Sequence, residues 1–225
     1  NQYIYKEKNF YKKKIVFCVP NTLIHFFQKK LKPKLISLGA QNCHYHETYG
    51  PFTGSVNASM LKKIGAEYII LGHSENRLEG ETNQIIKKKI ISALNQKLNV
   101  IFCIGETYKE KSKGKTFSIL RKQIKGSLNK KFIKNKIILA YEPVWSIGTN
   151  KIPKKSELQN TIKFIKKDFR KIFKTNKSPK VLYGGSVNHQ SIGLLSSISE
   201  IDGFLIGSAS QSAKKFIDIV KNYYK

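Results

Sequence analysis

Short apolar runs alternate with longer amphipathic segments along most of the chain. The apolar runs predict strands at Ile15–Val19, Leu35–Gly39, Tyr68–Leu71, Val100–Ile104, Ile137–Tyr141, Val181–Tyr183 and Phe204–Ile206. The amphipathic segments predict helices that include Thr22–Leu31, Asn57–Ile64, Thr82–Leu98, Lys115–Leu128, Ser156–Phe173 and Ala209–Tyr224. Because the strand runs are apolar throughout and helices separate them, the pattern predicts an α/β fold with a parallel sheet covered by helices.

The strand runs end in glycine, polar or acidic residues, which gathers the candidate chemistry at the carboxyl ends of the strands. Barrels built from parallel strands and helices carry their sites at that end. No linker and no internal repeat interrupts the alternation. At 225 residues the chain is therefore expected to form a single domain over residues 1–225.

The pattern shows seven strands, one fewer than a closed eight-stranded barrel needs. Only Asn1–Lys14 precede the first predicted strand, and this segment is basic and aromatic without an apolar run. It is expected to be the end of a helix. A barrel formed by this chain would thus lack its first strand and most of its first helix.

One strand leads directly into a carboxylate. The run Ile137–Ala140 is followed closely by Glu142, Pro143 then stiffens the exit, and a short apolar segment ends at Gly148. Apolar cover raises the basicity of a carboxylate by removing its water, and a closing loop supplies such cover. The segment therefore predicts a general base at a strand tip with a hinged flap beside it.

A histidine follows another strand directly. In Ile70–Glu75, His73 precedes residues of the kind that cap helices. One interpretation is a helix start with a satisfied histidine. The other is an electrophile that faces a helix N-terminus, whose positive end keeps the imidazole neutral. A neutral imidazole can donate a proton to a carbonyl oxygen and take it back.

The last two strands end in turns of small residues. Val181–Tyr183 leads into paired glycines and Ser186, and the second turn contains Gly207 and Ser208. Backbone amides without bulky side chains can approach a phosphate, and a helix N-terminus favours an anion. Either turn alone is more often an ordinary loop, but together they predict a phosphate site formed by Ser186, Gly207 and Ser208.

The net charge of +28 raises the question of a nucleic-acid partner. However, Arg77, Arg121 and Arg170 are the only arginines, and the lysines are spread along the whole chain. We therefore expect attraction of small anionic substrates and no specific nucleic-acid binding. No apolar run is long enough to span a membrane. Three cysteines without a CxxC pair fit a reducing cytoplasm.

Several strings together resemble the triosephosphate isomerase family. They are Gly39–Asn42, Phe52–Gly54, Ile70–Glu75, Cys103–Glu106, Ala140–Thr149, Val181–Ser186 and Gly203–Ala209, in the order the family has them. The resemblance runs from about Ile15 to Tyr224. It implies a (β/α)8 TIM barrel and interconversion of dihydroxyacetone phosphate and D-glyceraldehyde 3-phosphate without a cofactor.

The resemblance also implies roles for single residues. Glu142 would remove a carbon-bound proton, and His73 would shuttle protons at the oxygens through an enediolate. Gly148, in the flap from Pro143 to about Lys151, would add a backbone contact to the phosphate. Glu106 is expected to be a structural carboxylate below the site.

The chain departs from the family at the first strand, which carries an Asn and an essential Lys. No such string is present, and Lys6, Lys8, Lys12, Lys13 and Lys14 lack the strand context. On its own the chain is expected to be an impaired enzyme, because that cation stabilises developing negative charge. As part of a longer protein it is expected to be an ordinary one. The alternatives are a non-catalytic barrel remnant and a basic nucleic-acid-binding protein.

The polar loop Gln41–Ser55 corresponds to a family loop that reaches into a partner subunit, which implies a homodimer. Ser55 and Asn76 replace a charged pair of the family, and both charges are lost together. A cluster in this loop resembles a set of metal ligands, namely Cys43, His44, His46 and Glu47. We expect no metal there, because no second group of ligands follows at a suitable spacing.

Overall fold

The computed structural model describes residues 14–31, 36–132 and 137–223. Their contacts divide the chain into two compact units. The first contains the described residues up to Phe102 and those of Gly126–Ile137; the second contains Cys103–Lys125 and the described residues from Ile138 onward. The expectation of a single domain stays a prediction.

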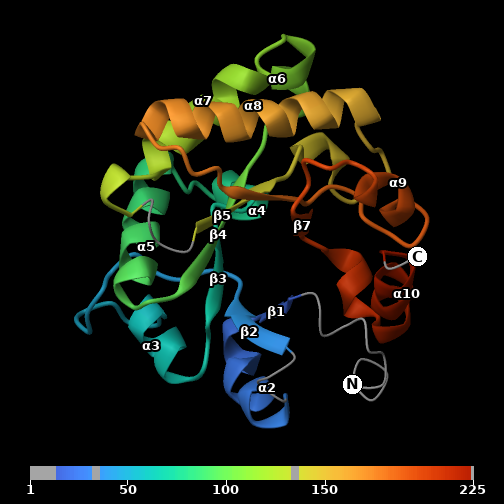
Figure 1. Ribbon diagram of the computed structural model, residues 1–225. Helices are drawn as coiled ribbons and strands as arrows, with labels where there is room; N and C mark the ends of the chain where they lie inside the picture. The colour runs from blue at the N-terminus through green and yellow to red at the C-terminus, as the bar shows by residue number, and fades with distance from the viewer. Residues whose placement is uncertain (1–13, 32–35, 133–136, 224–225) are drawn as a thin grey trace. The chain divides into compact units, whose positions relative to one another are not determined.

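The first unit contains a parallel sheet whose strands pair in chain order (Figure 1). The strands are β1 (Ile15–Val19), β2 (Ile36–Ala40), β3 (Tyr68–Leu71) and the first residues of β4 (Asn99–Ile104). The register pairs Ile15 with Ile36 and Tyr68 with Asn99. All residues of β2 and β3 are buried, as expected for parallel strands covered on both faces.

Helices lie between these strands in the chain. They are η2 (Asn21–Leu23), α2 (Ile24–Lys30), α3 (Ala58–Lys63), α4 (Ser74–Leu78) and α5 (Asn83–Asn95), and the first unit also contains η3 (Lys130–Phe132), which comes before β5. The helix α2 packs on β2, and α5 packs on both α3 and β3 (Figure 1). Thr82 caps α5 by accepting a hydrogen bond from the Ile85 amide, and the helix buries Ile86 and Ile90.

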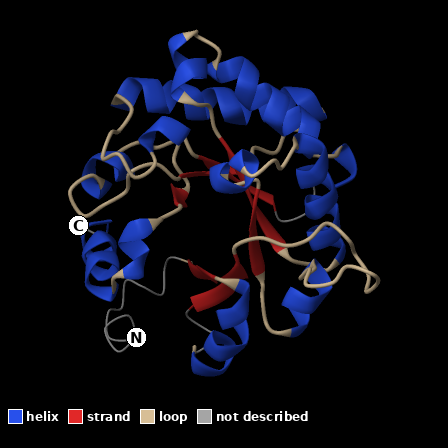
Figure 2. Cartoon of the chain, turned by 180° about the vertical axis from the view of Figure 1, so that it is seen from behind, coloured by secondary structure: helices blue, strands red, loops and turns tan. Residues whose placement is uncertain are grey.

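The second unit continues the same parallel pattern. Its strands are β5 (Ile137–Tyr141, from Ile138 on), β6 (Lys180–Tyr183) and β7 (Gly203–Phe204), again in chain order. The register pairs Tyr141 with Tyr183. The cartoon in Figure 2 shows strands in red, helices in blue and loops in tan, so the alternation of strand and helix can be followed along each unit.

The other regular elements are η4 (Val144–Ser146), α6 (Tyr108–Ser112), α7 (Thr116–Ser127), α8 (Lys155–Phe173), α9 (Ile192–Ser196), η5 (Ser208–Gln211) and α10 (Ala213–Tyr223). Side chains of α7 and α8 make two kinds of contact, a charged hydrogen bond and a stack of aromatic rings. Arg121 donates a bidentate hydrogen bond to the buried carboxylate of Asp168, and Phe117 stacks on Phe164 with ring centroids 4.3 Å apart. The long helix α8 is thereby fixed against α7.

The predicted helix Ala209–Tyr224 divides into η5 and α10. The Ser210 amide and hydroxyl both donate to the Gly207 carbonyl, at 2.9 and 2.7 Å, and Ser212 accepts from the Lys215 amide at the start of α10. Serine hydroxyls compete with the helical hydrogen bonds in this way. The short helices α6 and α9 are not among the predicted segments, whereas a helix start after His73 was expected and is α4. The strand β7 covers Gly203–Phe204, so it shares only Phe204 with the predicted Phe204–Ile206.

No helix in the described parts of the chain is long and apolar enough to cross a membrane. The expectation of a helix end in Asn1–Lys14 falls almost wholly outside the described residues, because 1–13 are not described. The predicted lack of a first strand is therefore not tested and stays a prediction.

Candidate active site

Glu142 follows the last residue of β5 and is buried, with 3% of its surface exposed. Its backbone is fixed in two places within the second unit. The Glu142 amide donates to the Ile104 carbonyl at 2.8 Å, and the Gly184 amide donates to the Tyr141 carbonyl at 2.9 Å. The carboxylate predicted at a strand tip thus lies at the carboxyl ends of β4, β5 and β6.

Two glycines allow other chain segments to approach Glu142 closely. A Cβ at Gly105 would lie 1.8 Å from the Glu142 carbonyl oxygen, and a Cβ at Gly184 would lie 2.7 Å from its Cγ. Neither position could hold another side chain without displacing Glu142. Gly105 therefore makes room for the Glu142 backbone, and Gly184 makes room for its side chain.

The residues after Glu142 form a compact flap. Pro143 leads into the short helix η4, and the chain then reaches Gly148, whose φ of +68° favours glycine. The Thr149 hydroxyl donates to the Trp145 carbonyl at 3.0 Å. The flap thus has internal hydrogen bonds as well as a glycine at the point where its direction changes.

Trp145 at the start of the flap is held by a buried carboxylate. Its indole N–H donates to Glu106 Oε1 at 3.1 Å, and the Tyr141 hydroxyl donates to the same carboxylate at 3.2 Å. Lys111 Nζ lies 3.7 Å from the centroid of the Trp145 ring and forms an ion pair with Glu157. The Glu106 carboxylate therefore contacts Trp145 near the start of the flap, and Tyr141 connects the same carboxylate to β5.

Burial raises the pKa of the Glu106 carboxyl above its ordinary value, although the Trp145 and Tyr141 donors act in the opposite direction. A raised pKa in the folded state contributes stability at low pH that is lost as pH rises through it. We therefore expect Glu106→Gln to gain stability relative to the unmodified protein between about pH 4 and about pH 8. Urea unfolding across this range measures the difference.

The control for this prediction is Glu79→Gln, which removes an exposed negative charge. Its stability difference from the unmodified protein should change less with pH than that of Glu106→Gln. A stability difference for Glu106→Gln that stays constant over the range would contradict the effect of burial on this carboxyl.

The predicted phosphate-binding residues lie in the second unit. Ser186 is buried, its hydroxyl donates to the Ser146 carbonyl at 2.5 Å, and its amide donates to the Ser146 hydroxyl at 3.4 Å. Gly207 and Ser208 are exposed at the start of η5, directly after the loop that follows β7. Ser186 is thus joined to the flap, a contact that the sequence analysis did not foresee.

His73 lies in the first unit, between β3 and α4. It is the N-cap residue of α4, and its Nδ1 accepts a hydrogen bond from the Glu75 amide at 3.4 Å. Because Nδ1 accepts this bond, Nε2 is the nitrogen that carries the proton of a neutral ring. The ring faces the helix start as predicted, so both interpretations of His73 fit its position.

Arg77 fixes the peptide before His73, a role that the sequence analysis missed. Its Nε donates to the Gly72 carbonyl at 2.7 Å, and its guanidinium also donates to Asn83 Oδ1 at 2.8 Å. Gly72 has a φ of +74°. Arg77 lies on α4, and its side chain points back toward Gly72. The arginine therefore fixes the turn that precedes His73.

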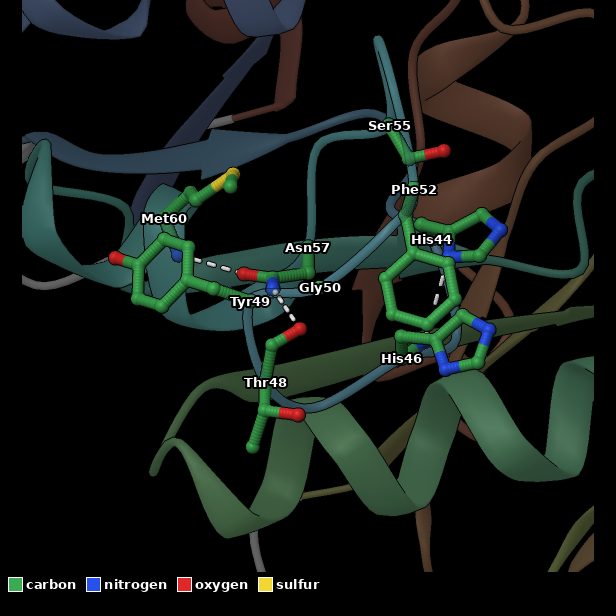
Figure 3. A pocket seen from close by; sticks show the side chains of 9 residues that line it. All are labelled: His44, His46, Thr48, Tyr49, Gly50, Phe52, Ser55, Asn57 and Met60. Atoms are coloured by element: carbon green, nitrogen blue, oxygen red, sulfur yellow. Dashed lines mark hydrogen bonds between the residues drawn. The ribbon is translucent and has the colours of Figure 1, made fainter.

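The loop Gln41–Ser55 is held together by stacked rings (Figure 3). The Phe52 ring lies against His46 with centroids 3.4 Å apart and near His44 at 5.8 Å. Asn95 on α5 donates to the Glu47 carboxylate at 2.9 Å. Figure 3 shows the hollow that these rings line together with Thr48, Tyr49, Gly50, Ser55, Asn57 and Met60.

Cys43, His44, His46 and Glu47 resemble metal ligands in the sequence, but they do not form a metal-binding group in the described structure. Within residues 14–31, 36–132 and 137–223, no three His, Cys, Asp or Glu residues are grouped so that they could hold a metal ion. Cys43 is buried, and burial raises the pKa of its thiol to about 12. Its thiol thus behaves as a small apolar group in the core.

Comparisons with known proteins identify the family. A sequence model of triosephosphate isomerase matches residues 1–223. The triosephosphate isomerase of Dictyoglomus thermophilum is 41% identical over 226 residues, which cover 98% of this chain and 90% of the relative. That of Borrelia garinii subsp. bavariensis is 41% identical over 92% of this chain and 84% of its own length.

A solved structure agrees with these sequence matches. The crystal structure of triosephosphate isomerase from Bartonella henselae matches with a TM-score of 0.82 and 35% identity, covering 93% of this chain and 86% of that one. The fold is thus the α/β TIM-barrel fold, as the resemblance implied. These matches span nearly the whole chain, so it belongs to the triosephosphate isomerase family, with the isomerase function EC 5.3.1.1.

Proposed function

We propose that Glu142 and His73 carry the proton transfers of the isomerase reaction, and that Gly148, Ser186, Gly207 and Ser208 bind the substrate phosphate. The observation that carries this proposal is the buried carboxylate of Glu142 at the end of β5, which is packed against Gly184 and followed by the flap. A buried carboxylate is a stronger base than a hydrated one.

Glu142 takes a proton from the carbon next to the carbonyl of dihydroxyacetone phosphate. The electron pair moves into a carbon–carbon double bond, the carbonyl becomes an enediolate, and Glu142 returns the proton to the neighbouring carbon. The product is D-glyceraldehyde 3-phosphate. His73 donates its Nε2 proton to the carbonyl oxygen, where negative charge develops, and takes a proton from the neighbouring hydroxyl oxygen, which becomes the aldehyde oxygen.

The phosphate group is held by backbone and hydroxyl donors. Gly207 and Ser208 offer the amides at the start of η5, and Ser186 offers its amide and hydroxyl. Gly148 adds its amide when the flap covers the substrate. The excess of lysine attracts the dianionic substrate to the protein, an effect that weakens at high salt.

Isotope exchange in heavy water tests the proposed base. Glu142 exchanges its proton with solvent while the enediolate exists, so the isomerase should place deuterium on carbon in both product and recovered substrate. Proton NMR of the triose phosphates measures this. Turnover without any carbon-bound deuterium would contradict enediolate formation at a solvent-exchanging base.

A negative charge at Ser208 tests the phosphate site. Ser208→Asp places a carboxylate beside the expected phosphate, so we expect KM to rise about tenfold or more through like-charge repulsion, with little change in kcat. The neutral variant Ser208→Asn has nearly the same shape and serves as the matched control. Equal KM values for the two variants would place the phosphate elsewhere.

We also propose that the enzyme is a homodimer formed through the Gln41–Ser55 loop. The stacked rings of His44, His46 and Phe52 give this loop a defined shape, and Tyr49 is 59% exposed on it. Sedimentation equilibrium measures the state directly, and a monomer at micromolar concentration would contradict the proposal. The three free cysteines among the described residues support a cytoplasmic enzyme.

A further inference from the structure

The side chain of Gln123 reaches from α7 to the backbone that follows β4. Gln123 is partly buried, and its Nε2 donates to the Gly105 carbonyl at 2.9 Å. Its Oε1 accepts from the Gly105 amide, also at 2.9 Å. A carboxamide offers a donor and an acceptor side by side, as a strand offers its N–H and C=O groups. Gln123 therefore pairs with Gly105 in the way that a neighbouring strand would.

The same segment is bound on its other side to the chain that carries Glu142. The Glu142 amide donates to the Ile104 carbonyl at 2.8 Å, and the Val144 amide donates to the Glu106 carbonyl at 3.0 Å. These bonds continue the parallel pairing of β4 with β5 beyond the end of each strand. The segment is thus held between the α7 side chain and the backbone of the proposed base.

The contact between this segment and Glu142 is backbone against backbone. A Cβ at Gly105 would lie 1.8 Å from the Glu142 carbonyl oxygen and 2.6 Å from the carbonyl carbon. Packing this close has no free space to take up a displacement. A shift of the Gly105 peptide therefore moves the tip of β5, and the Glu142 carboxylate moves with it.

We propose that Gln123 is a positioning residue for Glu142. Its two hydrogen bonds fix the Gly105 peptide, and this peptide sets where the end of β5 places the carboxylate. The inference rests on the proposed role of Glu142 as the base. A small displacement of a base slows proton transfer, whereas the phosphate contacts at Ser208 stay in place. Loss of Gln123 should therefore lower kcat without an equal change in KM.

Gln123→Met tests the proposal. Methionine has nearly the length of glutamine, but it leaves the amide and carbonyl of Gly105 without these partners. We expect kcat to fall about tenfold, while KM and the inhibition constant of inorganic phosphate change by less than about threefold. Steady-state kinetics with phosphate as the added inhibitor measure all three constants, and thermal unfolding shows whether the variant is folded.

Arg121→Met is the matched control, because it introduces the same side chain two residues earlier on α7. It removes the hydrogen bonds to the buried carboxylate of Asp168 on α8 and leaves the bonds between Gln123 and Gly105. We expect its melting temperature to fall, since the buried charge loses its partner, while kcat stays within about twofold. Equal losses of kcat in Arg121→Met and Gln123→Met would assign the effect to loosening of α7 and overturn the proposal.

Gln123→Glu tests the donor bond by itself. The carboxylate still accepts from the Gly105 amide but has no proton for the Gly105 carbonyl, and protonation restores that donor. Partial burial and the facing carbonyl raise the pKa of the introduced carboxyl. We therefore expect the ratio of its kcat to that of the unmodified protein to rise at least threefold from about pH 8 to about pH 6.

Comparison at each pH removes the titration of the surrounding groups. Arg121 and Lys122 precede position 123 on α7, and Glu106 follows Gly105. Burial raises the pKa of Glu106, but this carboxyl is present in both proteins, as are the two cations. A rise in the ratio thus belongs to the introduced carboxyl.

The possible failures are distinguishable. A folded Gln123→Met protein with kcat within about twofold of the unmodified value overturns the positioning role and leaves Glu142 as the base. If Gln123→Met does not fold, Gln123→Glu decides, because a kcat ratio that stays constant with pH overturns the role equally. Retention of activity in Glu142→Gln overturns the proposed base, and the inference about Gln123 with it.

Discussion

Glu142→Gln is expected to lower kcat by about four orders of magnitude, which is the largest effect of a single substitution in this protein. Glutamine has the shape of glutamate and can pack against Gly184 in the same way, but its amide cannot accept the carbon-bound proton. KM should change little, because the phosphate contacts are not altered. Steady-state kinetics in both directions of the reaction measure both constants.

Glu142→Asp is the matched comparison. It keeps the carboxylate but withdraws it by one methylene, so a loss of about a hundredfold is expected from misplacement of the base. Thermal unfolding of both variants shows whether the buried site still folds. If the folded Glu142→Gln protein kept more than a tenth of the activity, Glu142 would not be the base.

The strands are the part of this fold that the sequence predicts best. The bounds of β1, β3 and β5 agree with the apolar runs residue for residue. A buried parallel strand must be apolar on both faces, which explains the agreement for β3, whereas most of β1 is only partly buried. The start of α10 was harder to predict from the sequence, because the hydroxyls of Ser210 and Ser212 end one helical turn and begin another.

The candidate site was predictable where a side chain follows a strand in the chain. Glu142 and His73 are of this kind, since the end of each strand places the next residue. Contacts made between distant segments were not predictable. Ser146 meets Tyr183 and Ser186, which are 37 and 40 residues further along, and nothing in the local pattern connects them.

The local sequence also did not predict which neighbours the glycines of the site make room for. The pair Gly184–Gly185 was interpreted as an approach to a phosphate, which is the common reason for such a pair. The structure gives each glycine a neighbour within the protein. Gly184 makes room for the Glu142 side chain, and Gly185 makes room for the hydroxyls of Tyr183 and Ser146. The turn therefore fits closely around Glu142 and Ser146, next to the proposed phosphate contact of Ser186.

His73→Asn is expected to lower kcat by about two to three orders of magnitude while the start of α4 stays intact. Asparagine is a favourable N-cap residue, so its side-chain oxygen can accept the Glu75 amide in place of Nδ1. Its amide can donate a hydrogen bond to the developing enediolate, but it cannot give up a proton and recover it. The variant thus removes the chemistry of the imidazole and keeps its structural bond.

His73→Ala completes the comparison, because it removes both the imidazole and the cap. The two interpretations of His73 give different results for this pair. If the histidine only caps α4, His73→Asn should be nearly as active as the unmodified protein, and His73→Ala should lose about 1 kcal/mol of stability. If it is the electrophile, both variants should lose activity to a similar extent and differ only in stability.

Urea unfolding and steady-state kinetics of the two proteins, with the exposed His25→Gln on α2 as the control, measure these quantities. We expect the second result, because Nε2 is left as the proton donor when Nδ1 accepts from Glu75.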